Sequence, residues 1–426
     1  MPKSFPSEIV RSFVLYLKDD KKSLHSCLLV SRDWCREVVG LLWRQPFRFL
    51  YTCNKTNLSV PLQSTNPKLI NDCHCSDKRR SQASNLLLTY YSINYYDELI
   101  KEGIIDTKSR KILFNYFEFL NVLDLHELYS AIRDWINWEN SDNKIRLLNL
   151  LNSKFSLDSI YTLDNYTPLT FKSIYRYFFT YSPELKLLSF DTNLILYKIN
   201  NNNPCLFLNV AVHSYFHNKH NNILLDQLNE FNFPEIRQSF TNLTELVFSV
   251  GGDKSTIFSS LSQICHNIQK MIIILPYPYI FCLFGDSFIK NEDSLEKLAS
   301  LIRSQHNLIY FELSDNTHQK GTMSEILKSL KESQHNSLKT LIFKYIMIDN
   351  NDNVLIYLKY FQNLQELTFY KCIYDGKMDE KKNYYEEGLW LPNLKCLQID
   401  YKNEYKKESE ELLSILFGCS PLLNEI

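Results

Sequence analysis

The residues best suited by type and spacing to bind a metal ion are Cys73, His74 and Cys75, with Cys53 as the nearest further ligand. A structural zinc site takes four Cys or His ligands, and three adjacent residues cannot all point at one ion in the usual loop spacing. The eleven cysteines of the chain include no C-x-x-C pair. We therefore expect free thiols in a loop here, and no metal.

A second candidate group is His213, His217 and His220, whose i, i+4, i+7 spacing would align them on one face of a helix. Two His side chains one turn apart could share an ion. However, no Glu follows His213, as the H-E-x-x-H motif of zinc proteases requires. We expect a polar helix or loop face without a metal.

Common catalytic and nucleotide-binding motifs are absent from the sequence. The chain has only nine glycines and contains no G-x-G-x-x-G, G-x-x-x-x-G-K-S/T or G-x-S-x-G run. Phosphate-cradling loops need glycine where the backbone approaches the ligand closely. The sequence therefore predicts a non-catalytic protein without a cofactor. An enzyme with an unfamiliar site is the distant alternative, since acid–base pairs depend on spatial environment.

Charge and hydropathy argue against nucleic acid and membrane partners. The chain has 47 basic and 48 acidic residues, so no net field would draw it to a polyanion. Its one compact basic run, Lys78-Arg79-Arg80, predicts a solvated loop cluster, with a localisation signal as the alternative. The longest apolar run, residues 271–284, is too short to span a bilayer. Without a secretory signal pattern, we expect the reducing cytoplasm or nucleus.

The first 50 residues carry the pattern of three short helices. Pro6 suits the first turn of a helix over residues 5–17, in which Ile9, Phe13 and Leu17 follow at i, i+4 and i+8. A unit this short buries too little surface to be comfortably stable alone. Its wide apolar faces therefore indicate a covering partner, either another protein or the rest of the chain.

The ends of the second and third helices are marked by capping residues. Ser23 is expected to cap the second helix and Ser31 the third, in which Trp34 opens an apolar stripe. Pro46 is expected to end the third helix.

Three runs in this segment resemble the F-box, as it occurs in the large fungal set of F-box proteins. Residues 5–10 (FPSEIV) are similar to its Leu-Pro-x-Glu-Ile opening, residues 23–34 (SLHSCLLVSRDW) to its middle, and Leu42-Trp43 to its end. The resemblance covers residues 4–47. Phe5 departs from the usual Leu, and Ser31 stands where many members have Cys.

The resemblance implies a three-helix module that docks on the Skp adaptor of a Skp–cullin–F-box ubiquitin ligase. Carried over by position, the docking residues would be Phe5, Pro6, Ile9, Leu24, Leu28, Val30 and Trp34. The chain would contribute proximity, and the ubiquitin-conjugating enzyme the chemistry. The alternative is a plain helical cap on the region that follows.

A spacing of the Leu-x-x-Leu-x-Leu type recurs through the rest of the chain. Complete copies begin at Leu120, Leu185, Leu243, Ile268, Leu308, Leu338, Leu364 and Leu394, and a partial copy begins at Leu423. Five of the six later intervals are 25–30 residues and one is 40 residues, whereas the first two, of 65 and 58 residues, are near twice the usual length, as if each held one degenerate repeat. Period and motif are typical of leucine-rich repeats, in which the motif forms a short strand.

Helical stretches between the copies complete a strand–helix unit. They lie at residues 294–303, 323–330 and 412–417. In the last of these, Leu412, Leu413, Leu416 and Phe417 would share one apolar face. The pattern predicts an α/β solenoid, leucine-rich-repeat-like, with parallel strands on its concave face. The Asn that usually ends such a motif is not regularly present. The alternative is a single irregular α/β domain.

We expect an F-box module at residues 1–50, a connector at 51–110 and a leucine-rich-repeat-like solenoid at 111–426. The connector would hold a polar loop at 66–84 and a helix at 86–105, and residues 374–388 would form a loop insertion. The last copy would stop within a strand without a polar capping repeat. That predicts a truncated gene model or a fragment.

The sequence as a whole predicts a substrate-receptor subunit of a Skp–cullin–F-box ubiquitin ligase. Its partners would be the Skp adaptor, a cullin reached through the adaptor, and a target protein held on the solenoid. The rival interpretation is a repeat scaffold or interaction module that recruits no ligase. The repeated pattern marks only the inward residues, so it does not identify the target.

Overall fold

A computed structural model describes most of the chain. The described residues are 6–50, 76–106, 112, 114–138, 142–143, 145–147, 149–150, 166–191, 234–249, 255–275, 292–315, 322–349, 354–375, 389–401 and 406–425. The Cys and His groups considered above (residues 53, 73–75, 213, 217 and 220) lie outside them, as does Phe5.

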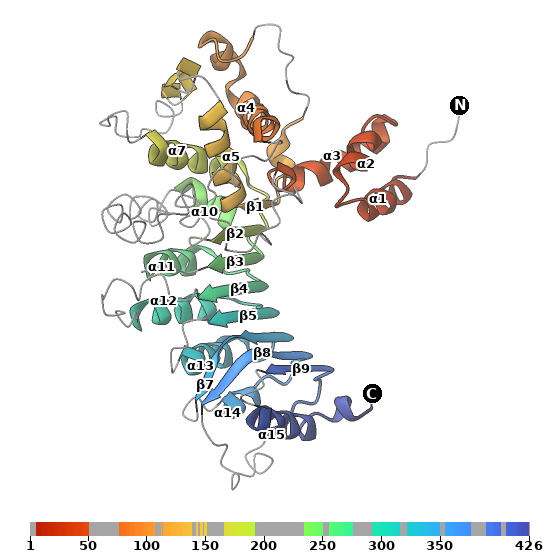
Figure 1. The fold of residues 1–426 in the computed structure, drawn as a ribbon, viewed down its shortest axis with the longest axis vertical. Coiled ribbons are helices and arrows are strands. Elements are labelled where there is room, and N and C mark those ends of the chain that lie inside the picture. The colour runs from red at the N-terminus through yellow and green to blue at the C-terminus, as the bar shows by residue number, and fades with distance from the viewer. Residues whose placement is uncertain are drawn as a thin grey trace, which may run out of the picture.

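The described strands form one open, parallel sheet, here named the repeat sheet, which runs along the length of the molecule (Figure 1). Its strands are β1 (Val122–Asp124), β2 (Leu187–Asp191), β3 (Glu245–Ser249), β4 (Lys270–Leu275), β5 (Tyr310–Asp315), β6 (Thr340–Lys344), β8 (Glu366–Asp375) and β9 (Cys396–Tyr401). They pair in chain order, and β7 (Met347–Asp349) pairs with the second half of β8. The architecture is therefore α/β with a sheet that does not close.

The recurring spacing sets the register of the repeat sheet. The second apolar position of each copy lies directly opposite its equivalent in the next strand. These positions are Leu123, Leu188, Leu246, Met271, Phe311, Leu341, Leu367 and Leu397. All are fully buried except Leu397, which is half-buried on the last strand. Alternate residues of a strand share a face. The predicted strands are thus confirmed for the complete copies, except that β1 ends at Asp124 and Leu125, the third apolar position of the first copy, begins the helix that follows.

Helices lie along one side of the repeat sheet (Figure 1). They are α5 (Leu125–Trp138), α7 (Tyr166–Tyr181), α10 (Pro234–Thr241), α11 (Ser255–Ile264), α12 (Glu292–Arg303), α13 (Thr322–Gln334), α14 (Val354–Leu358) and α15 (Lys406–Gly418). Consecutive helices from α11 to α14 pack on one another. The helices predicted at 294–303 and 323–330 are confirmed within α12 and α13.

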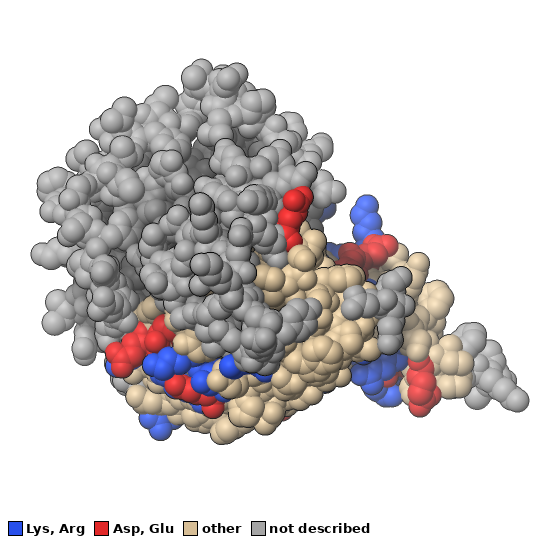
Figure 2. Space-filling view, turned by 90° about the horizontal axis from the view of Figure 1, so that it is seen from below, with Lys and Arg blue, Asp and Glu red and all other residues tan. Residues whose placement is uncertain are grey.

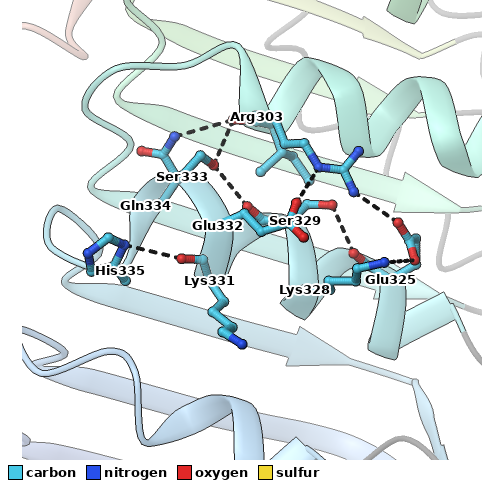
Figure 3. A network of polar contacts seen from close by, with 10 residues as sticks. Arg303, Glu325, Lys328, Ser329, Lys331, Glu332, Ser333, Gln334 and His335 are labelled. Atoms are coloured by element: carbon cyan, nitrogen blue, oxygen red, sulfur yellow. Dashed lines mark hydrogen bonds and ion pairs between the residues drawn. The ribbon is translucent and has the colours of Figure 1, made fainter.

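Charged side chains tie the outer surfaces of α12 and α13 together (Figure 3). Arg303 Nη2 lies 3.0 Å from Glu325 Oε1, and its Nε lies 2.7 Å from Glu332 Oε2. Both glutamates come from α13, so one guanidinium on α12 holds two turns of the neighbouring helix. Because these groups are about one-third exposed, we assign them to helix alignment and not to a large gain in stability.

The strands β1, β2 and β3 pair directly with one another, so no further strand lies between them in the repeat sheet. Leu188 of β2 lies directly opposite Leu246 of β3, and Leu123 of β1 lies opposite Leu188. The expectation of one degenerate repeat in each interval is therefore wrong for this sheet. Chain length between two strands does not decide whether they pair, because a parallel crossover can be long.

Three other expectations are corrected by the structure. Leu423 lies in the 3₁₀-helix η11 (Pro421–Glu425), so the partial copy there does not form a strand. In α15, Leu412 and Leu416 are buried, but Leu413 and Phe417 are 39% and 45% exposed, so the four do not share one buried face.

The third correction concerns the expected polar loop at 66–84. The helix α4 (Ser76–Lys101) already begins within it, so the basic run Lys78-Arg79-Arg80 is helical. Arg79 Nε donates to Asp134 Oδ2 on α5 at 2.8 Å, and Asp134 is only 3% exposed. The run is therefore not a solvated loop cluster, because its middle residue pairs inside the fold. The predicted helix at 86–105 is confirmed in large part by α4.

The expected insertion at 374–388 is described only at its start. Tyr374 and Asp375 belong to the end of β8, where they pair with β7. Residues 376–388 lie outside the described residues.

An asparagine ladder joins neighbouring copies, and the sequence analysis missed it. Asn242, Asn267, Asn363 and Asn393 each precede the first apolar position of a copy. Each donates its side-chain N–H to a backbone carbonyl of the preceding copy, at 2.8–3.1 Å. The sequence signal for the ladder is an Asn directly before the Leu-x-x-Leu-x-Leu motif, whereas the Asn usual in leucine-rich repeats ends the motif.

Candidate docking surface on the N-terminal helices

Three helices at the N-terminus form a unit, here named the helical module (residues 6–50), that projects from one end of the repeat sheet (Figure 1). They are α1 (Ser7–Tyr16), α2 (Lys21–Cys27) and α3 (Arg32–Arg44), followed by the 3₁₀-helix η1 (Arg48–Leu50). The predicted three-helix pattern is thus confirmed for the described residues.

The helix starts follow from local hydrogen bonds. Ser31 Oγ accepts from the backbone N–H of Trp34 at 3.4 Å, which confirms Ser31 as the N-cap of α3. The N-cap of α2 is Asp20 and not Ser23, because an Asp20 carboxylate oxygen accepts from the N–H groups of Lys22 and Ser23. The Ser23 hydroxyl, which donates to Asp20 Oδ2 at 2.7 Å, and these backbone bonds lower the pKa of Asp20. As expected, α3 ends just before Pro46.

The helical module has a small core of its own. Val10, Val14, Leu24 and Val38 are buried together, at exposures of 0–1%. Leu17, Cys27, Leu28, Trp34, Leu41 and Leu42 pack half-buried around them. The predicted apolar stripe of α1 is thereby divided, because its valines face inward while Ile9 and Phe13 face solvent.

Exposed apolar side chains are concentrated on this module. It carries six of the twelve exposed large apolar side chains among the described residues, namely Ile9, Phe13, Leu15, Tyr16, Leu29 and Val30. Ile9, Phe13 and Tyr16 are spaced i, i+4, i+7 on α1 and so share a face. The Phe13 ring packs in a T-shaped arrangement with Trp34 at the start of α3, with centroids 5.8 Å apart. An apolar face this rich on so small a unit makes this surface a candidate for docking.

The residues expected to dock divide into three groups in the structure. Pro6, Ile9 and Val30 are exposed, the last two at 56% and 62%. Leu28 and Trp34 are half-buried. Leu24 is fully buried.

Leu24 therefore supports the module's own core, and a partner on the described surface does not reach it. The sequence reasoning omitted Phe13 and Leu29, which are 59% and 80% exposed. The sequence did contain signals for these two residues, since Phe13 lies one helical turn after Ile9 and Leu29 directly precedes Val30.

The module is joined firmly to the repeat sheet at the end of α3. The Arg44 carbonyl accepts from the backbone N–H of Asn121, just before β1, at 3.2 Å. The Trp43 ring stacks on Tyr116 at 3.6 Å between centroids. Phe47 is buried against Tyr90 and Phe178. Trp43 and Phe47 thus belong to the core of the sheet region, whereas the candidate docking face lies on α1 and in the turn before α3.

A second surface is the face of the repeat sheet opposite its buried apolar positions. Lys270 Nζ lies 3.5 Å from Glu245 Oε2 and 5.3 Å from the centre of the Tyr310 ring. Tyr310 Oη donates to Glu312 at 2.7 Å, and Lys344 Nζ lies 2.6 Å from the same carboxylate. Burial and Glu312 raise the pKa of Tyr310. The chain of contacts crosses four strands, so this face is polar, aromatic and internally charge-paired.

The described residues offer binding surfaces more clearly than reactive groups. Burial raises the pKa values of the Cys265 and Cys372 thiols to about 12, so these thiols are protonated and poorly nucleophilic near neutral pH. Within the described ranges, no three His, Cys, Asp or Glu side chains gather where they could hold a metal ion. None of the described helices combines the length and apolar character that crossing a membrane requires. Seen from the C-terminal end, basic and acidic residues are interspersed over the described surface (Figure 2).

In the comparison with known proteins, no protein-family model and no curated protein match this chain.

Proposed function

We propose that the chain is a substrate-receptor subunit of a Skp–cullin–F-box ubiquitin ligase. The helical module would be an F-box that binds the Skp adaptor, which in turn binds a cullin. The observation that carries the proposal is the exposed apolar face of α1, formed by Ile9 and Phe13, with Val30 exposed in the turn before α3. Two of these three are residues at which the F-box resemblance expects adaptor contacts.

The repeat sheet would be a leucine-rich-repeat-like solenoid that holds the target protein. In-register strands, helices along one side and an asparagine ladder support this assignment. The target would lie on the polar and aromatic face that includes Tyr310 and Lys344. The receptor has no catalytic residue in this scheme, because its role is to hold the target near the ubiquitin-conjugating enzyme. The scheme goes with a cytoplasmic or nuclear location.

Binding of purified Skp adaptor to the full chain tests the proposal. Removing residues 1–47 would also remove Trp43 and Phe47 from the core of the sheet region, so point variants are the better probe. The double variant Ile9→Glu, Val30→Glu places charge on the exposed face, and we expect at least about tenfold weaker adaptor binding.

Leu15→Glu is the matched control. Leu15 is also exposed on α1 (44%), but it lies on the opposite side of the helix from Ile9 and Phe13. The Leu15→Glu variant should bind the adaptor as tightly as the native chain does. Failure of the native chain to bind, or equal binding by the double variant, would refute the ligase proposal.

One observation favours a rival function, that of a repeat scaffold whose helices only cap the sheet. The bond from Asn121 to the Arg44 carbonyl extends the pattern of backbone bonds between copies onto α3. A cap would need this junction but not the exposed face of α1. The same adaptor measurement therefore separates the two functions.

A further inference from the structure

Two histidines lie side by side where consecutive copies of the repeat meet. His266 and His306 stand at the same place, just before the copies that begin at Ile268 and Leu308. The backbone N–H of His306 donates to the His266 carbonyl at 3.1 Å. The centres of the two imidazole rings are 5.7 Å apart, at an interplanar angle of 42°. The stacking of one copy on the next therefore brings together two metal-ligating side chains that lie far apart in the chain.

Hydrogen bonding leaves one ring nitrogen of His266 available. Nδ1 of His266 lies 3.2 Å from the Ser304 carbonyl oxygen. A carbonyl can only accept, which assigns the hydrogen to Nδ1 and leaves a lone pair on Nε2 of the neutral ring. Histidines that bind metals usually donate their other ring N–H to a carbonyl or carboxylate in this way. His306 is exposed, and its ring makes no hydrogen bond within the described part of the chain.

The spacing of the two rings fits a shared metal ion. An imidazole nitrogen binds zinc at about 2.0–2.1 Å and lies about 1.2 Å from its ring centre, so each centre would be about 3.2 Å from the ion. At the tetrahedral angle the two centres would then be about 5.3 Å apart. The observed 5.7 Å is close to that distance. Small rotations of two side chains at the surface supply the difference.

We propose that His266 and His306 together bind a divalent transition-metal ion of the zinc type. Neutral imidazole is a preferred ligand of such ions. No third His, Cys, Asp or Glu joins the pair among the described residues. Structural zinc sites have four protein ligands, whereas two imidazoles leave positions for water, so this ion exchanges with solvent. When bound, it joins two copies whose motifs lie 40 residues apart, the longest interval after the first two.

Counting the zinc bound by the full chain tests the inference. The native chain and the double variant His266→Gln, His306→Gln are dialysed against Zn²⁺ at about pH 8, and the bound metal is measured by elemental analysis. Glutamine keeps each position polar but removes the imidazole. Because the cysteines of the chain can also bind zinc, the measured quantity is the difference in ions per chain. The double variant should bind one ion fewer, and each single variant should bind that ion at least about tenfold more weakly.

His335→Gln is the matched control. His335 is exposed just after α13, and its Nδ1 also lies near a backbone carbonyl, that of Lys331, at 3.1 Å (Figure 3). No second imidazole lies against it among the described residues. This variant should therefore bind as many zinc ions as the native chain does. Loss of the same ion from His335→Gln would overturn the inference, as would equal numbers of ions in the native chain and the double variant.

Hydrogen exchange locates the bound ion without relying on a variant. Zn²⁺ should slow exchange of the His306 amide, which bonds to the His266 carbonyl, by at least about twofold in the native chain. The same amide should not respond to Zn²⁺ in the double variant. Unchanged exchange in the native chain would also overturn the inference. Neither measurement uses the adaptor, so the result is independent of the proposed function.

Discussion

The helical module and the repeat sheet differ most in how much core each one owns. The module buries four side chains of its own, whereas the core of the sheet region is continuous from Phe47 to Cys419. Each central strand has a neighbour on both sides and a helix behind it, so its apolar positions are fully enclosed. The module instead leaves an apolar face open. Repeated strands and helices that enclose their apolar side chains suit a rigid scaffold. A unit with a small core and an open apolar face suits docking.

The largest effect is expected in the middle of the repeat sheet. Phe311 is fully buried on β5 between Met271 and Leu341. Phe311→Ala should lower the free energy of unfolding by about 3–5 kcal/mol, because it leaves a cavity between two fixed strands. Urea denaturation measures this loss. Phe13→Ala, on the exposed face of the module, should change it by less than about 0.5 kcal/mol. Similar losses for both would contradict the contrast in enclosure.

The next largest effect is expected at a buried amide that links two copies. Gln334 Nε2 donates to the Gln305 carbonyl at 2.6 Å, and its Oε1 accepts from the backbone N–H of Leu308 at 3.0 Å. Gln334→Ala leaves both backbone groups unpaired in the interior and should cost about 2–3 kcal/mol. Gln362→Ala, at an exposed site, is the control and should cost far less. Equal thermal shifts in the two variants would show that Gln334 is not needed for the link.

A smaller effect is expected at Trp34 in the helical module. The side chain is half-buried beside the small core, and its ring packs in a T-shaped arrangement with Phe13. Trp34→Ala should therefore cost about 1–2 kcal/mol, less than a fully buried aromatic. Arg36→Ala, whose side chain is 76% exposed, should cost almost nothing. A loss at Trp34 as large as that at Phe311 would mean that the module is enclosed as fully as the sheet.

The smallest effect is expected in the asparagine ladder. Asn363 donates to the Asn336 carbonyl at 2.8 Å from an exposed position, so Asn363→Ala should cost about 0.5–1 kcal/mol, one net hydrogen bond. Asn307 stands at the same place in its copy, but its side chain makes no hydrogen bond within the described part of the chain. Asn307→Ala is therefore the control. Equal melting temperatures for the two variants would show that the asparagine ladder does not stabilise the fold.

Much of the repeat sheet was predictable because its pattern is local. Alternating apolar residues such as Leu341 and Phe343 predict a strand with one buried face. The repetition of that pattern predicts that equivalent residues align in neighbouring strands. The wrong expectation of an extra repeat in each of the two long intervals shows the limit of such patterns. A local pattern marks where strands lie, but not how much chain passes between two strands that pair.

The candidate docking surface was only partly predictable. The spacing of α1 identifies Ile9, Val10, Phe13 and Val14 as apolar, but it cannot say which pair turns inward. That depends on where α3 brings Val38, which the pattern of α1 does not contain. Leu24 was expected to dock and is core for the same reason.

The sequence by itself determined the strands, the helices and the alignment of one copy on the next. These depend on interactions within a turn, a strand or a repeated unit. The tertiary structure alone decided which apolar faces stay open, and that Gln45 meets Glu127, 82 residues away. It also decided that Arg79 pairs with Asp134 inside the fold. Contacts between distant elements depend on how those elements pack, and no local spacing records that.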